Sequence, residues 1–402
     1  VGEKGLRVVR QKLCSTVDEA TIFAGDELNV SASSTLAISK ETETDADISN
    51  HDSSSLLSKK DRMIESFADE LDNHEGLLGQ GTNSPSSSAQ LNDDDNQSIS
   101  NPEQLSSFCV VKPCRGVASD DVYFCKNLQD VKEAFQKIHN TNVFGSASGE
   151  KHESVLVQEF AKGTEYALDI VSKNGEHKVA CLWRYDKRPA NNAPFVYFAT
   201  EVVSAQMEKG RQVCKYAMDV LDALDVKWGL SHVEVILLDS KDDGNGEPVL
   251  VEVNCRQHNT DFVPLTSISI GYNALDMLLS AYLGDDGNSL PIETEHLRLD
   301  WDELPTLSKP RAFAAIVHLV NYAEGEVVGV NRDVLEEIES LPSVLAMEIY
   351  DHFGIGNQIR PTIDIRSDSG WCHIMNDEET QFIADYERIV ELMPHMFIVK
   401  NE

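Results

Sequence analysis

The sequence lacks the features that mark several common classes of protein. No hydrophobic run approaches the roughly 20 apolar residues of a membrane-spanning helix, which argues against a membrane protein. Basic residues are scarce: 34 Lys and Arg stand against 68 Asp and Glu, and the formal net charge is −34. That balance argues against nucleic acid or an anionic membrane as a partner. It does not exclude a bound nucleotide, which needs only a local cationic pocket.

Cysteine is not arranged for disulfides or for metal binding. The eight cysteines are scattered, no C-x-x-C pair occurs, and there is no tandem Cys/His pattern. Several, including Cys109, Cys125 and Cys181, lie in apolar runs. Reduced, buried thiols in an intracellular, cytoplasmic protein are therefore expected. The sequence also shows no signal peptide, no clear repeat and no Ser or Cys in the pattern of a catalytic nucleophile.

The composition that is present divides the chain into folded and unfolded parts. With 402 residues, 41% of them hydrophobic, two or three packed domains are expected. Residues 29–107 are rich in Ser, Asp, Asn and Thr and cannot bury enough apolar surface to offset the entropy of the chain. We predict a disordered acidic insertion there, in which only Lys59–Leu71 has the pattern of a short amphipathic helix.

The most informative stretch is VLVEVNCRQHN, from Val249 to Asn259. It reads as a strand in which Glu252 and Asn254 point to the same face, because side chains alternate with a period of two. A carboxylate and an amide oxygen at this spacing suit a hard cation such as Mg²⁺. Arg256 follows and can hold an anionic oxygen.

A second strand lies upstream of this stretch and carries its partner carboxylate. Ser231–Asp239 places Glu234 on the same face as His232, and the segment between the strands is dense in turn-forming residues. A hairpin folded about Asp243 brings Glu234 opposite Glu252. Metal binding is one interpretation of this arrangement, and a solvated sheet face with exposed charges is the other.

Another hairpin is predicted after the insertion. Phe108–Pro113 and Val122–Cys125 read as strands around a loop of small and polar residues, with Lys112 at its base. Small residues let backbone N–H groups approach an anion closely, so this loop is a candidate phosphate cover. An ordinary turn beside a solvated lysine is the alternative. Further along the chain, Lys187–Asn192 reads as a polar loop between strands.

Taken in order, these pieces resemble the ATP-grasp superfamily of carboxylate–amine ligases. The resemblance runs from Val1 to Leu283 around the insertion and rests on VVKP with its small-residue loop, VQEF followed by GTEY, HVEV, and VEVNCR where E-x-N-P-R is more usual. The segment from Arg311, with GIGNQIRPTID, is similar to the small C-terminal domain of ATP-grasp L-amino-acid ligases.

The resemblance implies an α+β fold in which two α+β lobes grip ATP. Residues 1–28 with 108–157 would form the small lobe, residues 158–290 the large lobe, and residues 308–402 a small C-terminal α+β domain. The sequence Leu6–Leu13 reads as a first strand, and the family normally has an N-terminal α/β domain and an early lysine ahead of it. We therefore expect an incomplete chain, the alternative being a natural truncation without activity.

The resemblance also implies roles for individual residues. Three residues stay open or outside the chemistry: His232 either supports Glu234 or is a packed strand histidine, His258 either contacts substrate or is a loop histidine, and Cys255, which stands where Pro is usual, is a structural substitution and not a nucleophile. The implied nucleotide contacts are Lys112 and Ser119 at the phosphates, within or beside the loop Arg115–Asp121, then Gln158, Glu159 and Phe160 at adenine, and Glu165 at the ribose. The implied catalytic set is Glu234, Glu252 and Asn254 on Mg²⁺ (or Mn²⁺), Arg256 on the acyl phosphate, and Lys187, or instead Arg184 or Arg188, near the γ-phosphate.

The predicted function is thus an ATP-dependent ligase that forms an amide or peptide bond through an acyl phosphate and releases ADP and phosphate. Its partners would be a small-molecule carboxylate and an amine, with an amino acid among them, and a homodimer is considered. The alternatives are another ATP-grasp enzyme, of carboxylase or purine-biosynthetic type, and a catalytically silent ATP-binding regulatory or scaffold protein.

Overall fold

The computed structural model describes residues 1–32, 108–116, 121–143, 146, 148–239, 246–283 and 299–400. Contacts divide the chain into two units, Val1–Ser34 with Ser106–Glu402 and Thr35–Leu105, and all described residues belong to the first. Nearly all of the predicted insertion, including Lys59–Leu71, lies outside the described residues. Its first residues do not fit the prediction: Val30 is buried, and its N–H donates to Ala24 O at 2.9 Å. The small lobe therefore continues beyond residue 28.

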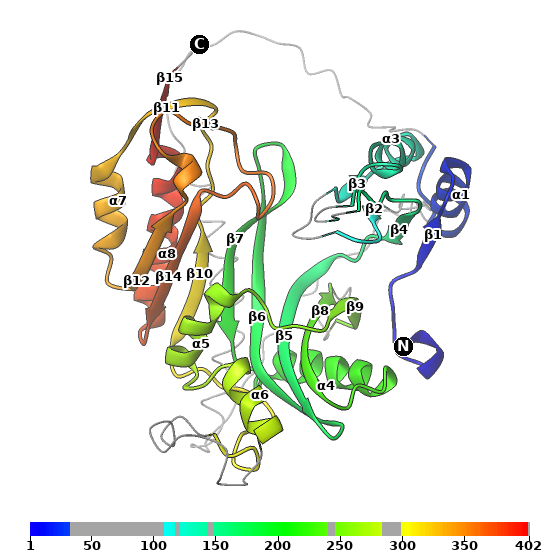
Figure 1. The fold of residues 1–402 in the computed structure, drawn as a ribbon, viewed down its shortest axis with the longest axis horizontal. Helices are drawn as coiled ribbons and strands as arrows, with labels where there is room; N and C mark the ends of the chain where they lie inside the picture. The colour runs from blue at the N-terminus through cyan, green and yellow to red at the C-terminus, as the bar shows by residue number, and fades with distance from the viewer. Residues whose placement is uncertain are drawn as a thin grey trace, which may run out of the picture. The chain divides into compact units, whose positions relative to one another are not determined.

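The small lobe is a four-stranded antiparallel sheet backed by two helices (Figure 1). A short 3₁₀ turn, Gly2–Lys4, precedes it. Helix α3 (Leu128–Ile138) begins where the Asn127 side chain accepts from the N–H groups of Gln129 and Asp130. Its buried face includes Val131, Phe135 and Ile138. The strands, in the order β1-β4-β2-β3, are β1 (Gln11–Cys14), β4 (Val155–Glu159), β2 (Cys109–Pro113) and β3 (Tyr123–Cys125), and the other helix is α1 (Val17–Ile22), continued by a π turn, Phe23–Glu27.

The large lobe is built on an eight-stranded antiparallel sheet. Helix α4 (Glu208–Ala223) packs its apolar stripe on one face, and the opposite face packs against α5 (Val263–Ser269) and α6 (Ala274–Leu283). Because both faces are covered, the central strands read as continuous buried runs. The large-lobe strands are β5 (Gly163–Lys173), β6 (Glu176–Ala190), β7 (Ala193–Val203), β8 (Gly229–Leu238) and β9 (Pro248–Asn254), with a 3₁₀ turn at Thr260–Phe262 after them.

The predicted loop Lys187–Asn192 is wrong over most of its length. Strand β6 continues to Ala190, and the turn to β7 is confined to Asn191 and Asn192, with φ of 50° and 63°. Asn tolerates this left-handed region, which a tight hairpin turn requires at both central positions. Lys187 therefore lies on strand β6, and the pairing of this strand sets the face of the sheet to which its side chain points.

The C-terminal residues extend the same sheet. Strand β10 (Phe313–His318) pairs with β7, so the full order is β12-β14-β10-β7-β6-β5-β8-β9. Figure 1 shows β10, β7, β6 and β5 side by side. The remaining elements are β12 (Val344–Ile349), β14 (Gly370–Asn376), α7 (Arg332–Glu339), α8 (Glu379–Leu392), a separate sheet β13-β11-β15 of Gln358–Ile359, Gly325–Val330 and Phe397–Lys400, and 3₁₀ turns at Asp351–Phe353 and Met393–His395.

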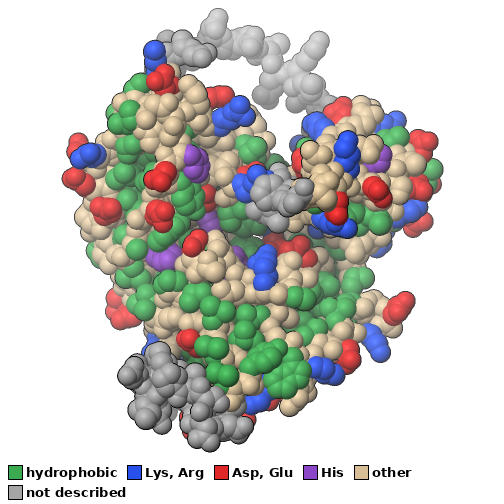
Figure 2. Space-filling view, viewed as in Figure 1, with side chains coloured by type: hydrophobic (Ala, Val, Ile, Leu, Met, Phe, Trp, Pro, Cys, Tyr) green, Lys and Arg blue, Asp and Glu red, His purple; other side chains and the backbone are tan. Residues whose placement is uncertain are grey.

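In the described ranges, no single helix is long and apolar enough to cross a membrane. One bent pair, Thr260–Ser269 with Ala274–Leu283, meets the length and composition criteria only when the two helices are taken together. Hydrophobic side chains gather on this part of the surface in Figure 2. Ile268, Leu279 and Tyr282 are each at least half exposed there.

Candidate active site

The predicted site residues gather on the sheet face opposite α4. Residues directly opposite each other in a sheet point to the same face, and Glu252, Glu234, Ala167 and Trp183 stand opposite one another in turn across β9, β8, β5 and β6. Alternation along each strand adds further side chains to this face. These are Glu165 and Asp169 on β5, Tyr185 and Lys187 on β6, His232 on β8 and Asn254 on β9.

The hairpin β8–β9 has the predicted register. Glu234 lies opposite Glu252 and His232 opposite Asn254, and the Asn254 amide donates to Glu252 Oε1 at 2.6 Å. A bulge follows, since Val235 pairs with Leu250. Glu252 is exposed whereas the Glu234 side chain is 17% exposed, so this carboxylate pair runs from solvent toward the interior.

The donor set of this hairpin fits a hard cation. Glu234, Glu252 and Asn254 offer only oxygen ligands, as Mg²⁺ prefers. Among the described residues no group of three or more His, Cys, Asp or Glu side chains is arranged to hold a metal ion. A cation here could therefore take two carboxylates, with the Asn254 amide oxygen as a third protein ligand.

Two side chains support Glu234 from the interior. His232 Nε2 and the Tyr185 hydroxyl each lie 3.4 Å from Glu234 Oε1. Burial favours the neutral carboxyl, but the hydrogen bond from His232 and the charges of Lys187 and His232 outweigh it and lower the pKa of Glu234. Burial likewise opposes charge on His232, yet its contacts with Asp169 and Glu234 raise its pKa to about 9.

Lys187 is the cation that lies in this group. Its Nζ donates to Glu165 Oε2 at 2.7 Å and lies 4.3 Å from the centroid of the Tyr197 ring. Burial alone would lower the pKa of Lys187, but Glu165, Tyr197 and Glu234 raise it, so the side chain stays an ammonium. Burial raises the pKa of Glu165. The charge of the Lys187 ammonium offsets this desolvation only in part, and the charge of Glu234 raises the pKa further.

The alternative cations are engaged elsewhere. Arg184 pairs with Glu201 at 3.1 Å from its Nε, and Arg188 pairs with Asp186 at 2.6 Å. Both alternate with Lys187 and Tyr185 along β6 and so point away from Glu165. Of the three candidates, the structure places only Lys187 beside the predicted nucleotide-binding and metal-binding carboxylates.

The predicted adenine segment is already tied into the protein. The N–H of Glu159 donates to Arg10 O at 2.8 Å and that of Phe160 donates to Phe108 O at 3.2 Å. The Glu159 carboxylate pairs with Arg7 and Arg10, and Gln158 donates to Gln11 at 2.8 Å. This segment is therefore not positioned to donate these two N–H groups to a nucleotide.

The remaining predicted residues are more loosely placed. Lys112 alternates with the buried side chains of β2, and its charge contributes to the surroundings of Glu165 and Glu234. Arg256 is exposed and donates to the Gln257 carbonyl at 2.8 Å. Arg115 pairs with Glu150 at 2.6 Å in an exposed position. Ser119 and most of the predicted phosphate loop lie outside the described residues.

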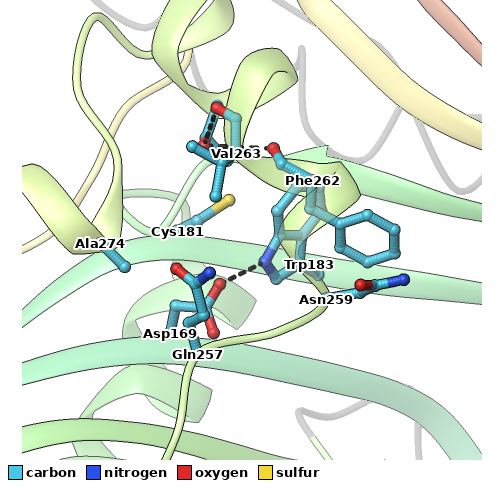
Figure 3. Close-up of a pocket in the computed structure, with 9 residues that line it drawn as sticks. Asp169, Cys181, Trp183, Gln257, Asn259, Phe262, Val263 and Ala274 are labelled. Atoms are coloured by element: carbon cyan, nitrogen blue, oxygen red, sulfur yellow. Dashed lines mark hydrogen bonds between the residues drawn. The ribbon is translucent and has the colours of Figure 1, made fainter.

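Sequence reasoning missed two residues at the centre of this face, Asp169 and Tyr185. Asp169 is 5% exposed and accepts from Trp183 Nε1 at 3.2 Å, a bond drawn in Figure 3. It borders a cavity of about 10 Å³, lined also by Gln257 and Phe262. The sequence contains a signal for Asp169, because it is the one charged residue in the apolar run Ala167–Val171. A carboxylate that is buried in such a strand requires hydrogen-bond partners.

Comparison with known proteins gives a domain family. Residues 105–262 match the ATP-grasp domain family. Dapdiamide A synthase of Enterobacter agglomerans is 28% identical over 176 residues, which are 43% of this chain and 39% of that protein. A formate-dependent phosphoribosylglycinamide formyltransferase of Methanocella arvoryzae is 26% identical over 225 residues, or 54% of this chain and 46% of that protein.

A solved structure has the same fold. The L-amino acid ligase from Bacillus licheniformis superposes with a TM-score of 0.54 at 19% identity, over 74% of this chain and 65% of that one. The chain spans less than half the length of the two curated relatives and under two thirds of this structure. The fold is α+β, as predicted, and the part of the chain that matches the ATP-grasp domain family is residues 105–262.

Proposed function

We propose that the full-length protein is an ATP-dependent carboxylate–amine ligase that forms an amide bond through an acyl phosphate. The observation that carries this proposal is the grouping of Glu165, Lys187, Glu234 and Glu252 on one face of the sheet, with Lys187 bonded to Glu165. A carboxylate substrate is a poor electrophile for an amine. Activation by ATP requires a site that binds and neutralises phosphate, which the Lys187 ammonium and a divalent cation held by Glu234, Glu252 and Asn254 would supply.

The chemistry follows from the charges on this face. The substrate carboxylate attacks the γ-phosphorus, the bond from phosphorus to ADP breaks, and an acyl phosphate forms. The amine then attacks the carbonyl carbon, phosphate leaves with the C–O bond electrons, and the nitrogen loses a proton. The Lys187 ammonium neutralises the transferring phosphoryl group, and the Arg256 guanidinium holds the anionic tetrahedral intermediate. Glu234, Glu252 and Asn254 would hold Mg²⁺, which neutralises charge on the phosphates when it is bound.

The substrate class is part of the proposal. One relative of this chain is named dapdiamide A synthase, and a structure with this fold is named an L-amino acid ligase. We therefore expect an amino acid as one of two small-molecule substrates. A homodimer and a cytoplasmic location stay predictions, as do the adenine, ribose and phosphate contacts of Gln158, Glu159, Phe160, Glu165, Lys112 and Ser119.

The test is phosphate release by the full-length protein with ATP, Mg²⁺ and a panel of single amino acids and amino-acid pairs. Release should require particular pairs and should fall by at least about 100-fold in Glu252→Ala, as expected when a group that stabilises transition-state charge is lost. Glu326→Ala is the matched control, because Glu326 is also an exposed strand carboxylate but lies in the separate sheet.

Either of two results contradicts the ligase. Phosphate release without any amino-acid dependence indicates another ATP-grasp reaction, and a panel of purine intermediates or bicarbonate then follows. Mg²⁺-dependent ATP binding without release identifies a regulatory or scaffold protein instead.

A further inference from the structure

Glu234 belongs to a closed ring of contacts on the interior side of the site. On one side His232 Nε2 lies 3.4 Å from Glu234 Oε1 and His232 Nδ1 lies 3.3 Å from Asp169 Oδ1. Asp169 Oδ1 also accepts from the backbone N–H of His258 at 2.7 Å. On the other side Tyr185 lies between Glu234 Oε1 at 3.4 Å and His258 Nε2 at 2.9 Å. The ring thus joins β8, β5 and β6 to the loop after β9.

The direction of the bonds through Tyr185 follows from the backbone. The Asn259 N–H donates to His258 Nδ1 at 2.8 Å, so Nδ1 is an acceptor and the neutral ring carries its proton on Nε2. Nε2–H therefore donates to the Tyr185 oxygen, and the Tyr185 O–H is left to donate to Glu234. The ring delivers two donors, one from His232 and one from Tyr185, to the same oxygen of Glu234.

Most of the ring is buried. Asp169, His232 and Tyr185 are 5%, 1% and 8% exposed, and the cavity beside Asp169 has room for about one water molecule. Asp169 has three donors, from Trp183, His232 and His258, which satisfy a buried carboxylate. Figure 3 shows Asp169 and Gln257 among the residues that line this cavity.

We propose that Asp169, His232, Tyr185 and His258 are positioning residues that hold Oε1 of Glu234, turn its Oε2 toward a divalent cation, and fix the loop that carries Arg256 relative to that cation. The inference rests on the proposed function, which supplies the roles of Glu234 and Arg256. His258 is two residues from Arg256, so the same ring sets both the metal ligand and the cationic loop. Groups that orient a metal ligand typically change metal affinity or activity by about 10- to 100-fold when they are removed.

The test compares Asp169→Asn, Tyr185→Phe and the double variant with wild type in the full-length protein. The direct readout is Mn²⁺ binding in the presence of ATP, measured by electron paramagnetic resonance, and steady-state kinetics at varied Mg²⁺ is the second. Two matched controls exist on α8. Asp385 is a buried carboxylate that accepts from the Ser343 N–H, the Ser343 hydroxyl and Gln381, and Tyr386 is a buried tyrosine bonded to Asp186 at 2.7 Å.

Each single ring variant should weaken Mn²⁺ binding by about 10-fold or more. The double variant should lose less than the product of the single losses, because both changes break one ring. Added Mg²⁺ should restore much of the rate, and the thermal melts of the variants and controls show whether a folding defect contributes. Asp385→Asn and Tyr386→Phe should melt at a lower temperature yet bind Mn²⁺ as wild type does.

Ring variants that bind Mn²⁺ no more weakly than these controls would overturn the proposal, as would a wild-type protein that binds no Mn²⁺ with ATP. Failure of the ligase proposal is a separate result: Mn²⁺ and ATP bind, but no phosphate is released. The same Mn²⁺ comparison among the variants then still decides whether the ring positions the metal ligand.

Discussion

At the scale of the residue, Lys187 has two separable roles. Its ammonium is bonded to Glu165, interacts electrostatically with Glu234 and lies over the rings of Tyr185 and Tyr197, with 16% of the side chain exposed. An ammonium there stabilises the fold because it is the counter-ion of two partly buried carboxylates on the same face of the sheet. The same charge is available to a phosphate. A substitution of Lys187 alone therefore cannot tell structure from chemistry.

A double variant separates these roles. Lys187→Met should cost about 3–5 kcal/mol of unfolding free energy, because one partner of a buried ion pair is left uncompensated. Adding Glu165→Gln removes the stranded carboxylate and should recover part of that loss, measured by urea unfolding. Phosphate release should stay at least about 100-fold below wild type in both variants. Recovery of the rate together with the stability would show that Lys187 is only structural.

At the scale of the element, strand β4 is joined to the N-terminal segment by charge. Glu159 at the end of β4 pairs with Arg7 and Arg10, which approach from the stretch before β1, and its side chain is 12% exposed. Burial would raise the pKa of Glu159, but the hydrogen bonds from Arg7 and Arg10 outweigh it and lower the pKa. The unfolded chain thus binds a proton more readily than the folded one.

This linkage has a definite sign. Stability from Glu159 is fully present above the carboxyl pKa of the unfolded chain, about 4.3, and is lost as the pH falls through the lower pKa of the folded state. Glu159→Gln should therefore be less stable than wild type at pH 7 by about 1–3 kcal/mol. The difference should shrink steadily below about pH 4. Thermal melts of both proteins from pH 7 to pH 3 measure it, and a constant difference would contradict the assignment.

The elements also show where sequence reasoning succeeds. The helical spacing of Val131, Phe135 and Ile138 predicts a helix over about 128–139, and helix α3 spans Leu128–Ile138, because apolar spacing is a local signal. The register of β8 against β9 follows from the alternation of side chains along each strand. A shift of one residue would turn Glu252 to the opposite face of the sheet from Glu234. The continuation of β6 through Pro189 was missed, because Pro and two Asn residues are local turn signals that tertiary pairing with β7 overrides.

The candidate site was predictable only in part, for the same reason. Glu234, Glu252 and Asn254 belong to one hairpin, so local spacing brings them together. The ring around Glu234 joins residues from three strands and a loop, and Asp169 and His258 are 89 positions apart. No periodicity in one sequence encodes such a contact. The lone Asp in an apolar strand predicts that partners exist without saying which they are.

At the scale of the whole molecule, the C-terminal strands belong to the sheet that carries the site. Strand β10 pairs with β7, the Thr200 hydroxyl lies 3.0 Å from His318 Nε2, and the Asn191 amide donates to the carbonyls of Asn321 and Thr362. The predicted boundary at residue 308 therefore divides the sequence but not the sheet. The stability of β7 depends on residues that lie more than a hundred positions later in the chain.

Removal of residues 309–402 tests this dependence. It leaves β7 as an edge strand with Thr200 and Val202, now 0% and 6% exposed, facing solvent. Unpaired edges with apolar side chains recruit other chains, so the shortened protein should aggregate, as measured by size-exclusion chromatography. Residues 309–402 alone should lack a cooperative thermal transition, because β10 has lost one of its two neighbours. Co-expression of the two pieces should restore a soluble complex, since the lost hydrogen bonds can form between chains. Two soluble fragments that each melt cooperatively would instead establish residues 309–402 as an independent domain that merely docks against β7.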